Sequence, residues 1–223
     1  MKIGEKDAAR FIDHTLLKPD ATLDDILQHC AEARSHGFAG VCVNPSYVSL
    51  ASNQLTGCGV AVGTVVGFPL GANHEKVKVL ETRQAIKEGA DEIDMVMALG
   101  LFKSGDLKET RREIERVVEA AEGRLVKVIL ETGLLSMREI EAACWLVMET
   151  AADFVKTSTG FGPVGATVAA VTTMRRVVGK ELGVKASGGI RNADQALTMI
   201  RAGADRIGTS SGVTIIEQWK NRM

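Results

Sequence analysis

Strand-like and helix-like segments alternate eight times along the 223 residues of this chain, and no other feature constrains the fold as strongly. Each strand-like segment is a short run of apolar and β-branched residues, and the stretch after it has apolar residues at helical spacing. Such alternation favours parallel strands joined by helices. The expected strands are residues 11–17, 40–43, 60–66, 92–97 and 125–130, a sixth strand that carries Lys156, and residues 183–187 and 204–208.

Eight strand–helix units in a chain of this length predict an α/β fold, a single (β/α)8 TIM barrel over residues 1–223. An open, doubly wound sheet is the alternative, and the count of eight favours the barrel. No linker rich in proline or serine and no shift in composition divides the chain. One domain is therefore expected.

The balance of charges narrows the range of partners. With 27 basic and 28 acidic side chains the formal net charge is -1, and there is no basic run, which argues against nucleic-acid or anionic-membrane partners. No apolar run is as long as a membrane span, and residues 1–7 lack the apolar core of a signal peptide. The four cysteines show no metal-like pairing and are expected to be reduced thiols of a cytoplasmic protein.

Four junctions between a helix and the next strand align without gaps. They precede the second, fourth, sixth and eighth strands and begin at Gly37, Gly89, Ala151 and Gly203. The sixth residues of these junctions are Cys42, Asp94, Lys156 and Gly208. Alternate strands of such a barrel contribute inward side chains to shared layers. Asp94 and Lys156 are therefore expected in one interior layer, with Cys42 beside them and open space above Gly208.

Lys156 has the most specific chemistry of these residues. A buried ammonium is costly, and a buried lysine tends to lose its proton rather than stay charged and unpaired. A neutral lysine is a nucleophile whose natural targets are carbonyl carbons. Two other interpretations stay open: a strand-end lysine whose ammonium reaches water, and a structural ion pair with Asp94.

Lys185, on the seventh expected strand, weakens the interpretation as an ion pair. Lysines on neighbouring strands can approach each other, and like charges lower the proton affinity of both amines. Lys127, on the fifth strand, is either a further interior cation or part of the outer face. The parity of the sequence does not decide between the two.

A phosphate site is indicated independently. Gly188 and Gly189 follow the seventh strand, and residues 208–212 (Gly-Thr-Ser-Ser-Gly) follow the eighth and open a helix. Loops at these two places, together with a helix N-terminus, form the usual phosphate site of this fold. Glycines let backbone N–H groups approach the oxyanion, and the hydroxyls of Ser210 and Ser211 add donors.

No metal and no cofactor are expected. His14, His29, His36 and His74 show no ligand spacing, and His29 and His36 are predicted at solvated helix positions. Residues 160–165 match the G-x-G-x-x-G dinucleotide pattern, but they lie in the sixth unit and no acidic residue ends the following strand. Nicotinamide binding is therefore not predicted.

Six segments, in order along essentially the whole chain, carry a resemblance to a known family. They are residues 13–17 (DHTLL), 41–45 (VCVNP), 67–71 (GFPLG), 92–96 (EIDMV), 154–160 (FVKTSTG) and 184–191 (VKASGGIR). They resemble deoxyribose-phosphate aldolase, and the two lysine motifs together are highly specific. The family has a (β/α)8 barrel and needs no metal. As a class I aldolase it reversibly cleaves 2-deoxy-D-ribose 5-phosphate to acetaldehyde and D-glyceraldehyde 3-phosphate.

The resemblance implies a Schiff base on Lys156, with Lys185 lowering the proton affinity of its amine and Asp94 serving the proton transfers through an ordered water. It also implies that Asp13 and Lys127 support this network. The residues implied for the phosphate are Gly160, Gly188, Gly189, Gly208, Ser210 and Ser211, with Arg191 near. The implied partners are the small-molecule substrates and further copies of the chain, as a homo-oligomer of two or more.

Two departures from the family bear on this assignment. Some members have a C-terminal tyrosine that helps in the proton transfers, whereas the only tyrosine here is Tyr47. Longer relatives often have lysine where this chain has Phe161.

Two other functions stay open: a synthase barrel that forms a lysine imine on a keto sugar phosphate, and a sensor that binds a sugar phosphate. A sensor has no need of Lys156, Lys185 and Asp94 together.

Overall fold

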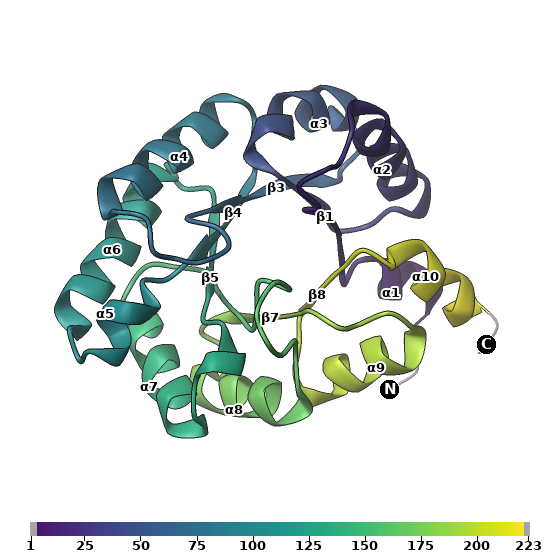
Figure 1. Ribbon diagram of the computed structural model, residues 1–223. Helices are drawn as coiled ribbons and strands as arrows, with labels where there is room; N and C mark the ends of the chain where they lie inside the picture. Colours follow the sequence, from purple (N-terminus) through teal and green to yellow (C-terminus); the bar gives the residue numbers. More distant parts are fainter. Residues whose placement is uncertain (1–3, 221–223) are drawn as a thin grey trace.

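The computed structural model describes residues 4–220, and its eight parallel strands close into a barrel in the order β1 to β8. They are β1 (Ile12–Leu16), β2 (Gly40–Val43), β3 (Ala61–Val66), β4 (Glu92–Val96), β5 (Leu125–Ile129), β6 (Phe154–Lys156), β7 (Gly183–Ser187) and β8 (Arg206–Thr209). Figure 1 shows the strands in the middle and the helices around them. The closed order confirms the predicted barrel and excludes the open sheet.

The helices form the outer layer, and all but the first and the last described ones lie between consecutive strands. They are α1 (Glu5–Ala9), α2 (Leu23–His36), α3 (Val48–Leu55), α4 (Glu75–Lys87), α5 (Leu99–Lys103), α6 (Leu107–Ala120), α7 (Met137–Met148), α8 (Val168–Val178), α9 (Ala193–Ala202) and α10 (Gly212–Lys220), with short 3-10 helices η1 (Pro45–Tyr47) and η2 (Thr132–Leu134). Thr22 and Ser136 begin α2 and α7 with capping boxes, which satisfy backbone N–H groups of the first turn.

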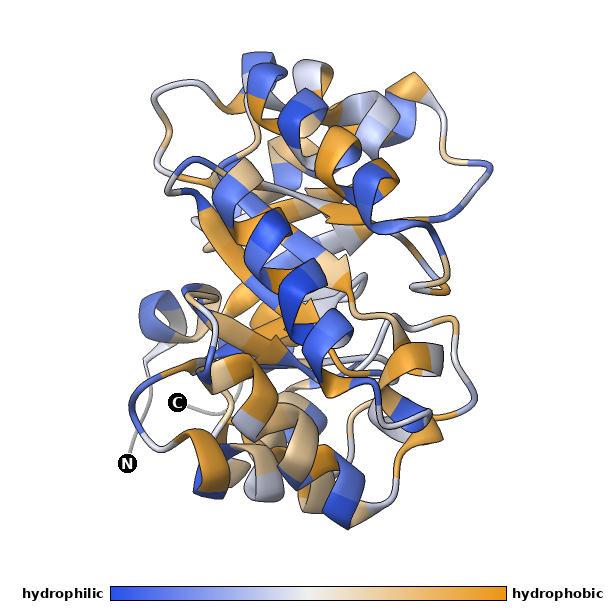
Figure 2. Ribbon diagram, turned by 90° about the vertical axis from the view of Figure 1, so that its left-hand side faces the viewer, coloured by the Kyte–Doolittle hydropathy of each residue, from blue (hydrophilic) through white to orange (hydrophobic). Residues whose placement is uncertain are grey.

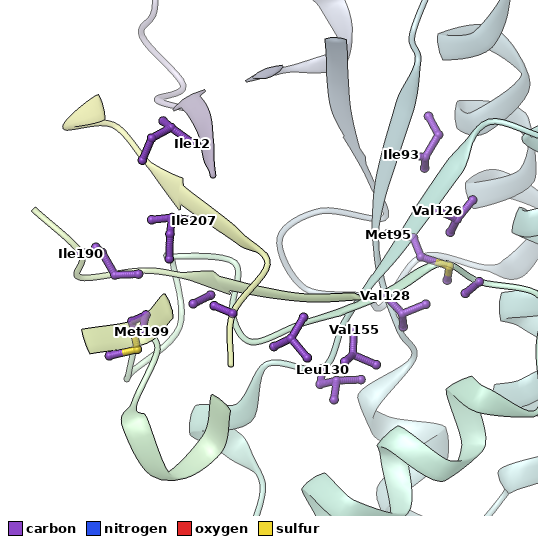
Figure 3. Close-up of a cluster of buried hydrophobic side chains, with 14 of the residues drawn as sticks. Ile12, Ile93, Met95, Val126, Val128, Leu130, Val155, Ile190, Met199 and Ile207 are labelled. Atoms are coloured by element: carbon purple, nitrogen blue, oxygen red, sulfur yellow. The ribbon is translucent and has the colours of Figure 1, made fainter. Parts of the chain in front are cut away.

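The outer face of the barrel is apolar. Ile93 and Met95 of β4, Val126 and Val128 of β5 and Val155 of β6 belong to one buried hydrophobic cluster, part of which Figure 3 shows. Successive side chains of a strand point to opposite faces. The residues between these, which include polar and charged ones, therefore point into the barrel.

The helices cover this apolar layer, and Figure 2 shows hydrophilic and hydrophobic segments alternating along them. This two-faced pattern is typical of helices that surround a core. Among residues 4–220, no helix combines the length and the apolar character that crossing a membrane requires.

Candidate active site

The strand register brings four charged side chains to the inside of the barrel. Asp94 of β4 is the register partner of Lys127 of β5, and Lys156 of β6 is the partner of Lys185 of β7. Each of the four residues is at most 2% exposed. Lys127 thus belongs to the interior and not to the outer face, the alternative that the sequence left open.

Asp94 is the centre of this group. Its Oδ2 accepts hydrogen bonds from Nζ of Lys156 and from Nζ of Lys185, both at 2.7 Å. Its Oδ1 accepts a hydrogen bond from Nζ of Lys127 at 2.9 Å. One buried carboxylate therefore holds three lysines from three different strands.

Neighbouring charges keep Asp94 and Lys185 in their ionised forms. Burial alone would raise the pKa of Asp94, but the three lysines outweigh it and hold that pKa well below its usual range. Burial likewise opposes the charge of Lys185, yet Asp13 and Asp94 outweigh it and raise the pKa of Lys185. The expected fall in the proton affinity of Lys185 is therefore wrong, because the carboxylates of Asp13 and Asp94, at 2.6 and 2.7 Å, stabilise its ammonium.

Asp13 and Lys127, the two expected supporting residues, lie in the same network. Nζ of Lys185 lies 2.6 Å from Oδ2 of Asp13. Burial alone would raise the pKa of Asp13. The positive charges of Lys185, Lys127 and Arg206 outweigh burial and lower this pKa to about 2. The pKa of Lys127 is raised, since Asp94 and Glu92 outweigh its burial.

A cavity of about 280 Å³ opens at the carboxyl ends of β1, β6, β7 and β8. Of the three interior lysines, only Lys156 lines it. The cavity is also lined by Thr15, Leu16, Leu17, Lys18, Thr159, Gly160, Phe161, Ser187, Gly188, Gly189, Ile190, Arg191, Gly208, Thr209 and Ser210. Lys156 is thus the interior lysine that borders the space open to a small molecule at this end of the barrel.

The loops expected to hold a phosphate line this cavity, with one exception. Gly160, Gly188, Gly189, Arg191, Gly208 and Ser210 are all lining residues, and Ser211 is not. Gly189 has φ +79°, and a Cβ on it would have no heavy atom within 4 Å, so its backbone borders open space. A left-handed backbone of this kind strongly favours glycine.

The space at Gly208 differs from the prediction. A Cβ there would lie 2.2 Å from Oγ of Ser187 and 3.1 Å from Cε of Lys185. The expected open space is therefore filled by these two side chains. Glycine is required because the side chains of β7 occupy the volume that a larger residue of β8 would need.

Cys42 lies in the predicted layer but packs as a core residue. It is buried against Leu17, Val65 and Phe68, and it does not line the cavity. Burial, together with the charge of Asp94, raises the pKa of the Cys42 thiol. The thiol is therefore protonated at neutral pH.

The histidines correct one prediction. His29 is only 6% exposed and stacks on His14, with ring centroids 3.8 Å apart and planes at 14°. Nε2 of His14 lies 2.9 Å from Oε2 of Glu32. His14, His29 and Glu32 therefore lie together, and their side chains are of types that bind metal ions. The lone pairs of two near-parallel rings do not converge on one ion, and we assign no metal here.

Two features of the site were not predicted from the sequence: the place of Lys18 and the contact that Phe161 makes. Lys18 and Arg191 are exposed cations at the cavity, and only Arg191 was anticipated. Phe161 of the loop after β6 meets Phe68 of the loop after β3 edge to face, at 5.4 Å between ring centroids. The position of Lys18 directly after the first expected strand could have indicated it as a cation of the site. The contact between Phe161 and Phe68 joins loops far apart in the sequence, so only the tertiary structure shows it.

Comparisons with known proteins agree with this geometry. The profile of the DeoC/LacD family aldolases matches residues 8–218. Deoxyribose-phosphate aldolase of Caldanaerobacter subterraneus subsp. tengcongensis is 55% identical over 217 residues, which cover 96% of this chain and 94% of that protein. The enzyme of the same name from Thermococcus gammatolerans is 55% identical over 219 residues and covers 96% and 97%.

Solved structures give the same result. A structure described as QR15, an aldolase, superposes with a TM-score of 0.93 at 41% identity and covers 97% of both chains. The deoxyribose phosphate aldolase of Aeropyrum pernix, described as a unique tetrameric structure, gives a TM-score of 0.92 at 36% identity and covers 99% of this chain and 94% of that one. A family profile that spans nearly the whole chain and relatives of this identity leave one conclusion: the chain is a member of the DeoC/LacD family of aldolases.

Proposed function

We propose that this chain is a class I aldolase that reversibly cleaves 2-deoxy-D-ribose 5-phosphate to acetaldehyde and D-glyceraldehyde 3-phosphate through a Schiff base on Lys156. One observation carries the proposal. Lys156 is the interior lysine that lines the cavity, and its amine lies 2.7 Å from the ionised carboxylate of Asp94. The relatives named deoxyribose-phosphate aldolase support the choice of substrate.

The reaction follows from this placement. The neutral amine of Lys156 attacks the aldehyde carbon of the open-chain sugar, and the resulting carbinolamine loses water to form a protonated imine. A base takes the proton of the C3 hydroxyl, the bond between C2 and C3 breaks, and its electron pair passes to the imine to give an enamine. Glyceraldehyde 3-phosphate leaves. Protonation of the enamine at C2 and hydrolysis release acetaldehyde and restore the amine.

Asp94 and Lys185 have different roles in this scheme. Asp94 is ionised and its carboxylate contacts the amine of Lys156, which places it to take up and return protons during the reaction, directly or through a water. Lys185 keeps its proton between Asp13 and Asp94 and serves as a fixed positive charge beside Lys156. Both amines contact the same oxygen of Asp94, so this fixed charge lies directly beside the amine that attacks the substrate.

The phosphate of the substrate would lie on the loops after β7 and β8. Gly189 and Ser210 border the cavity there, and the exposed side chains of Lys18 and Arg191 add positive charge at its opening. Backbone N–H groups of glycine-rich loops and cations together suit a dianion.

A coupled assay tests the proposal. The chain is incubated with deoxyribose 5-phosphate, and both products are measured with and without EDTA. We expect turnover that the chelator leaves unchanged and that Lys156→Met abolishes. Turnover that EDTA abolishes would replace the imine with a metal-dependent mechanism.

We also propose that the protein is a homo-oligomer in the cytoplasm. The tetrameric relative from Aeropyrum pernix supports an assembly of copies, and the four free cysteines fit a reducing compartment. Light scattering coupled to size-exclusion chromatography measures the number of copies. A mass equal to one chain at all concentrations would contradict the oligomer.

A further inference from the structure

Six charged side chains inside the barrel form a closed ring. Each member lies within 3.2 Å of an oppositely charged neighbour on both sides. The successive contacts are Asp94–Lys127 at 2.9 Å, Lys127–Glu92 at 2.6 Å, Glu92–Arg206 at 3.2 Å, Arg206–Asp13 at 2.5 Å, Asp13–Lys185 at 2.6 Å and Lys185–Asp94 at 2.7 Å. Carboxylates and cations alternate around this ring, which closes across strands far apart in the sequence.

The charges of the ring cancel. It contains three carboxylates, Asp13, Glu92 and Asp94, and three cations, Lys127, Lys185 and Arg206. Lys156 is attached to it only through Asp94, whose Oδ2 already holds Lys185. Among the described residues inside the barrel, a protonated Lys156 is therefore the one charge without a carboxylate of its own.

The remaining strands do not alter this balance. β2 contributes Cys42, whose thiol keeps its proton, and β3 contributes Gly63, where a Cβ would lie 3.7 Å from Cβ of Glu92. The charged and titratable groups of the strands around Lys156 are thus Asp13 of β1, Cys42 of β2, Glu92 and Asp94 of β4, Lys127 of β5, Lys185 of β7 and Arg206 of β8. Lys18 and Arg191 also line the cavity with Lys156, but their side chains are exposed to solvent.

We propose that Glu92 and Arg206, which do not line the cavity, are positioning residues that complete a neutral ring and so leave Lys156 as the amine that releases its proton and reacts. The inference rests on the proposed function, since it concerns the amine that forms the imine. Arg206 binds Asp13 and Glu92, and Glu92 binds Lys127, so both residues act on Lys156 through other members of the ring. Neither residue contacts the substrate in this scheme.

The two residues have opposite charges, so their removal has opposite consequences. Glu92→Gln leaves two carboxylates against three cations. The excess positive charge disfavours a proton on Lys156, and its amine reacts at lower pH. Arg206→Gln leaves three carboxylates against two cations, which favours the proton, and the amine reacts only at higher pH. A purely structural role would predict no such opposition.

The measurement is the pH dependence of imine formation. The intact protein is treated with acetaldehyde and cyanoborohydride across a pH series, and the rate of the adduct on Lys156 is followed by mass spectrometry. Relative to the parent, we expect the midpoint to fall by about one pH unit in Glu92→Gln and to rise by about one unit in Arg206→Gln. The double variant, which is neutral again, should return to the midpoint of the parent.

Two controls separate local from general effects. Arg111→Gln removes one positive charge from the exposed face of α6 and should leave the midpoint unchanged. Arg206→Lys keeps the charge of the ring and should stay near the parent. Thermal unfolding of each variant is recorded to identify variants that do not fold. If Arg206→Gln does not fold, Glu92→Gln, which keeps the shape of the side chain and a hydrogen-bonding oxygen, still tests the direction of the midpoint shift.

Each outcome of the pH series supports or contradicts the proposed role of Glu92 and Arg206. Midpoints that do not move, or that move in the same direction in both single variants, overturn the role of Glu92 and Arg206 while the parent still forms its adduct. Absence of an adduct in the parent overturns the proposed function itself, and the role of the ring with it.

Discussion

Lys156 and Lys185 stand side by side in register on β6 and β7, and both amines lie 2.7 Å from the same oxygen of Asp94. Their surroundings separate them. Lys185 has a second carboxylate, Asp13, at 2.6 Å and does not line the cavity, whereas Lys156 lines it and has Asp94 alone. Two identical side chains can therefore serve as a permanent cation and as a nucleophile.

Asp94→Asn should lower kcat for cleavage about 10²- to 10⁴-fold, because the acid–base group is lost. The amide also leaves three buried lysines without their shared charge, so the variant should be less stable. Asp153→Asn is the matched control. Its carboxylate accepts a hydrogen bond from the backbone N–H of Val126 at 2.8 Å, away from the cavity lining. A kcat of Asp94→Asn within tenfold of the parent would remove Asp94 from the chemistry.

Gly189→Asp should impair cleavage of deoxyribose 5-phosphate much more than cleavage of unphosphorylated deoxyribose, since the carboxylate repels the dianion from its loop. Gly105→Asp is a close control. Gly105 has φ +80° against +79° at Gly189, and a Cβ on either residue has open space around it. The backbone strain is thus the same in both variants, and only Gly189 lines the cavity. Steady-state kinetics on both sugars measure the effect, and equal losses on the two would exclude this loop as the phosphate site.

Lys78→Met should destabilise the fold by about 3–5 kcal/mol, because it leaves Glu113 buried without its partner. Nζ of Lys78 lies 2.6 Å from Oε1 of Glu113 and donates to the carbonyls of Gly71 and Val96 at 2.9 and 2.8 Å. It thereby ties the ends of β3 and β4 to the helices outside them. Lys76→Met, on the exposed side of α4, should change stability by less than about 0.5 kcal/mol. Urea denaturation compares the two, and similar values would show that the buried pair contributes nothing.

His29 should make the fold lose stability in mild acid. Burial, with His14 beside it, lowers the pKa of His29 from its ordinary value of 6.5 to about 3. The unfolded chain therefore binds a proton below about pH 6.5 that the folded chain refuses until about pH 3, so stability falls as the pH falls through this window. His29→Leu should flatten the dependence of unfolding free energy on pH between 6 and 4. An unchanged slope would show that His29 titrates alike in both states.

The barrel and the central charges could be predicted because they depend on local patterns. Period-two alternation places Asp94 and Lys156 among apolar strand residues, and the shared junction pattern aligns them. The same register, two residues earlier, holds Glu92 and Arg206, which neither the resemblance nor a motif singles out. The contact between Arg206 and Asp13 joins the first and last strands, and only closure of the barrel brings them together.

Other features needed the tertiary structure. His29 was expected in water because histidine is polar, yet it shares the buried face of α2 with Ile26, Cys30 and Ala33. Lys185 was expected to lose proton affinity to its neighbouring lysine, and only the structure shows Asp13 at 2.6 Å. Long-range partners of this kind decide the charge state of a buried group, and a single sequence does not reveal them.

Reductive trapping tests the central claim most directly. The protein is incubated with acetaldehyde, reduced with borohydride and digested, and the masses of the peptides are measured by mass spectrometry. The account predicts one ethyl group per chain, on Lys156, with Lys127 and Lys185 unmodified. An ethyl group mainly on Lys185 would reverse the roles of the two lysines, and a chain without a specific ethyl group would contradict the Schiff-base mechanism.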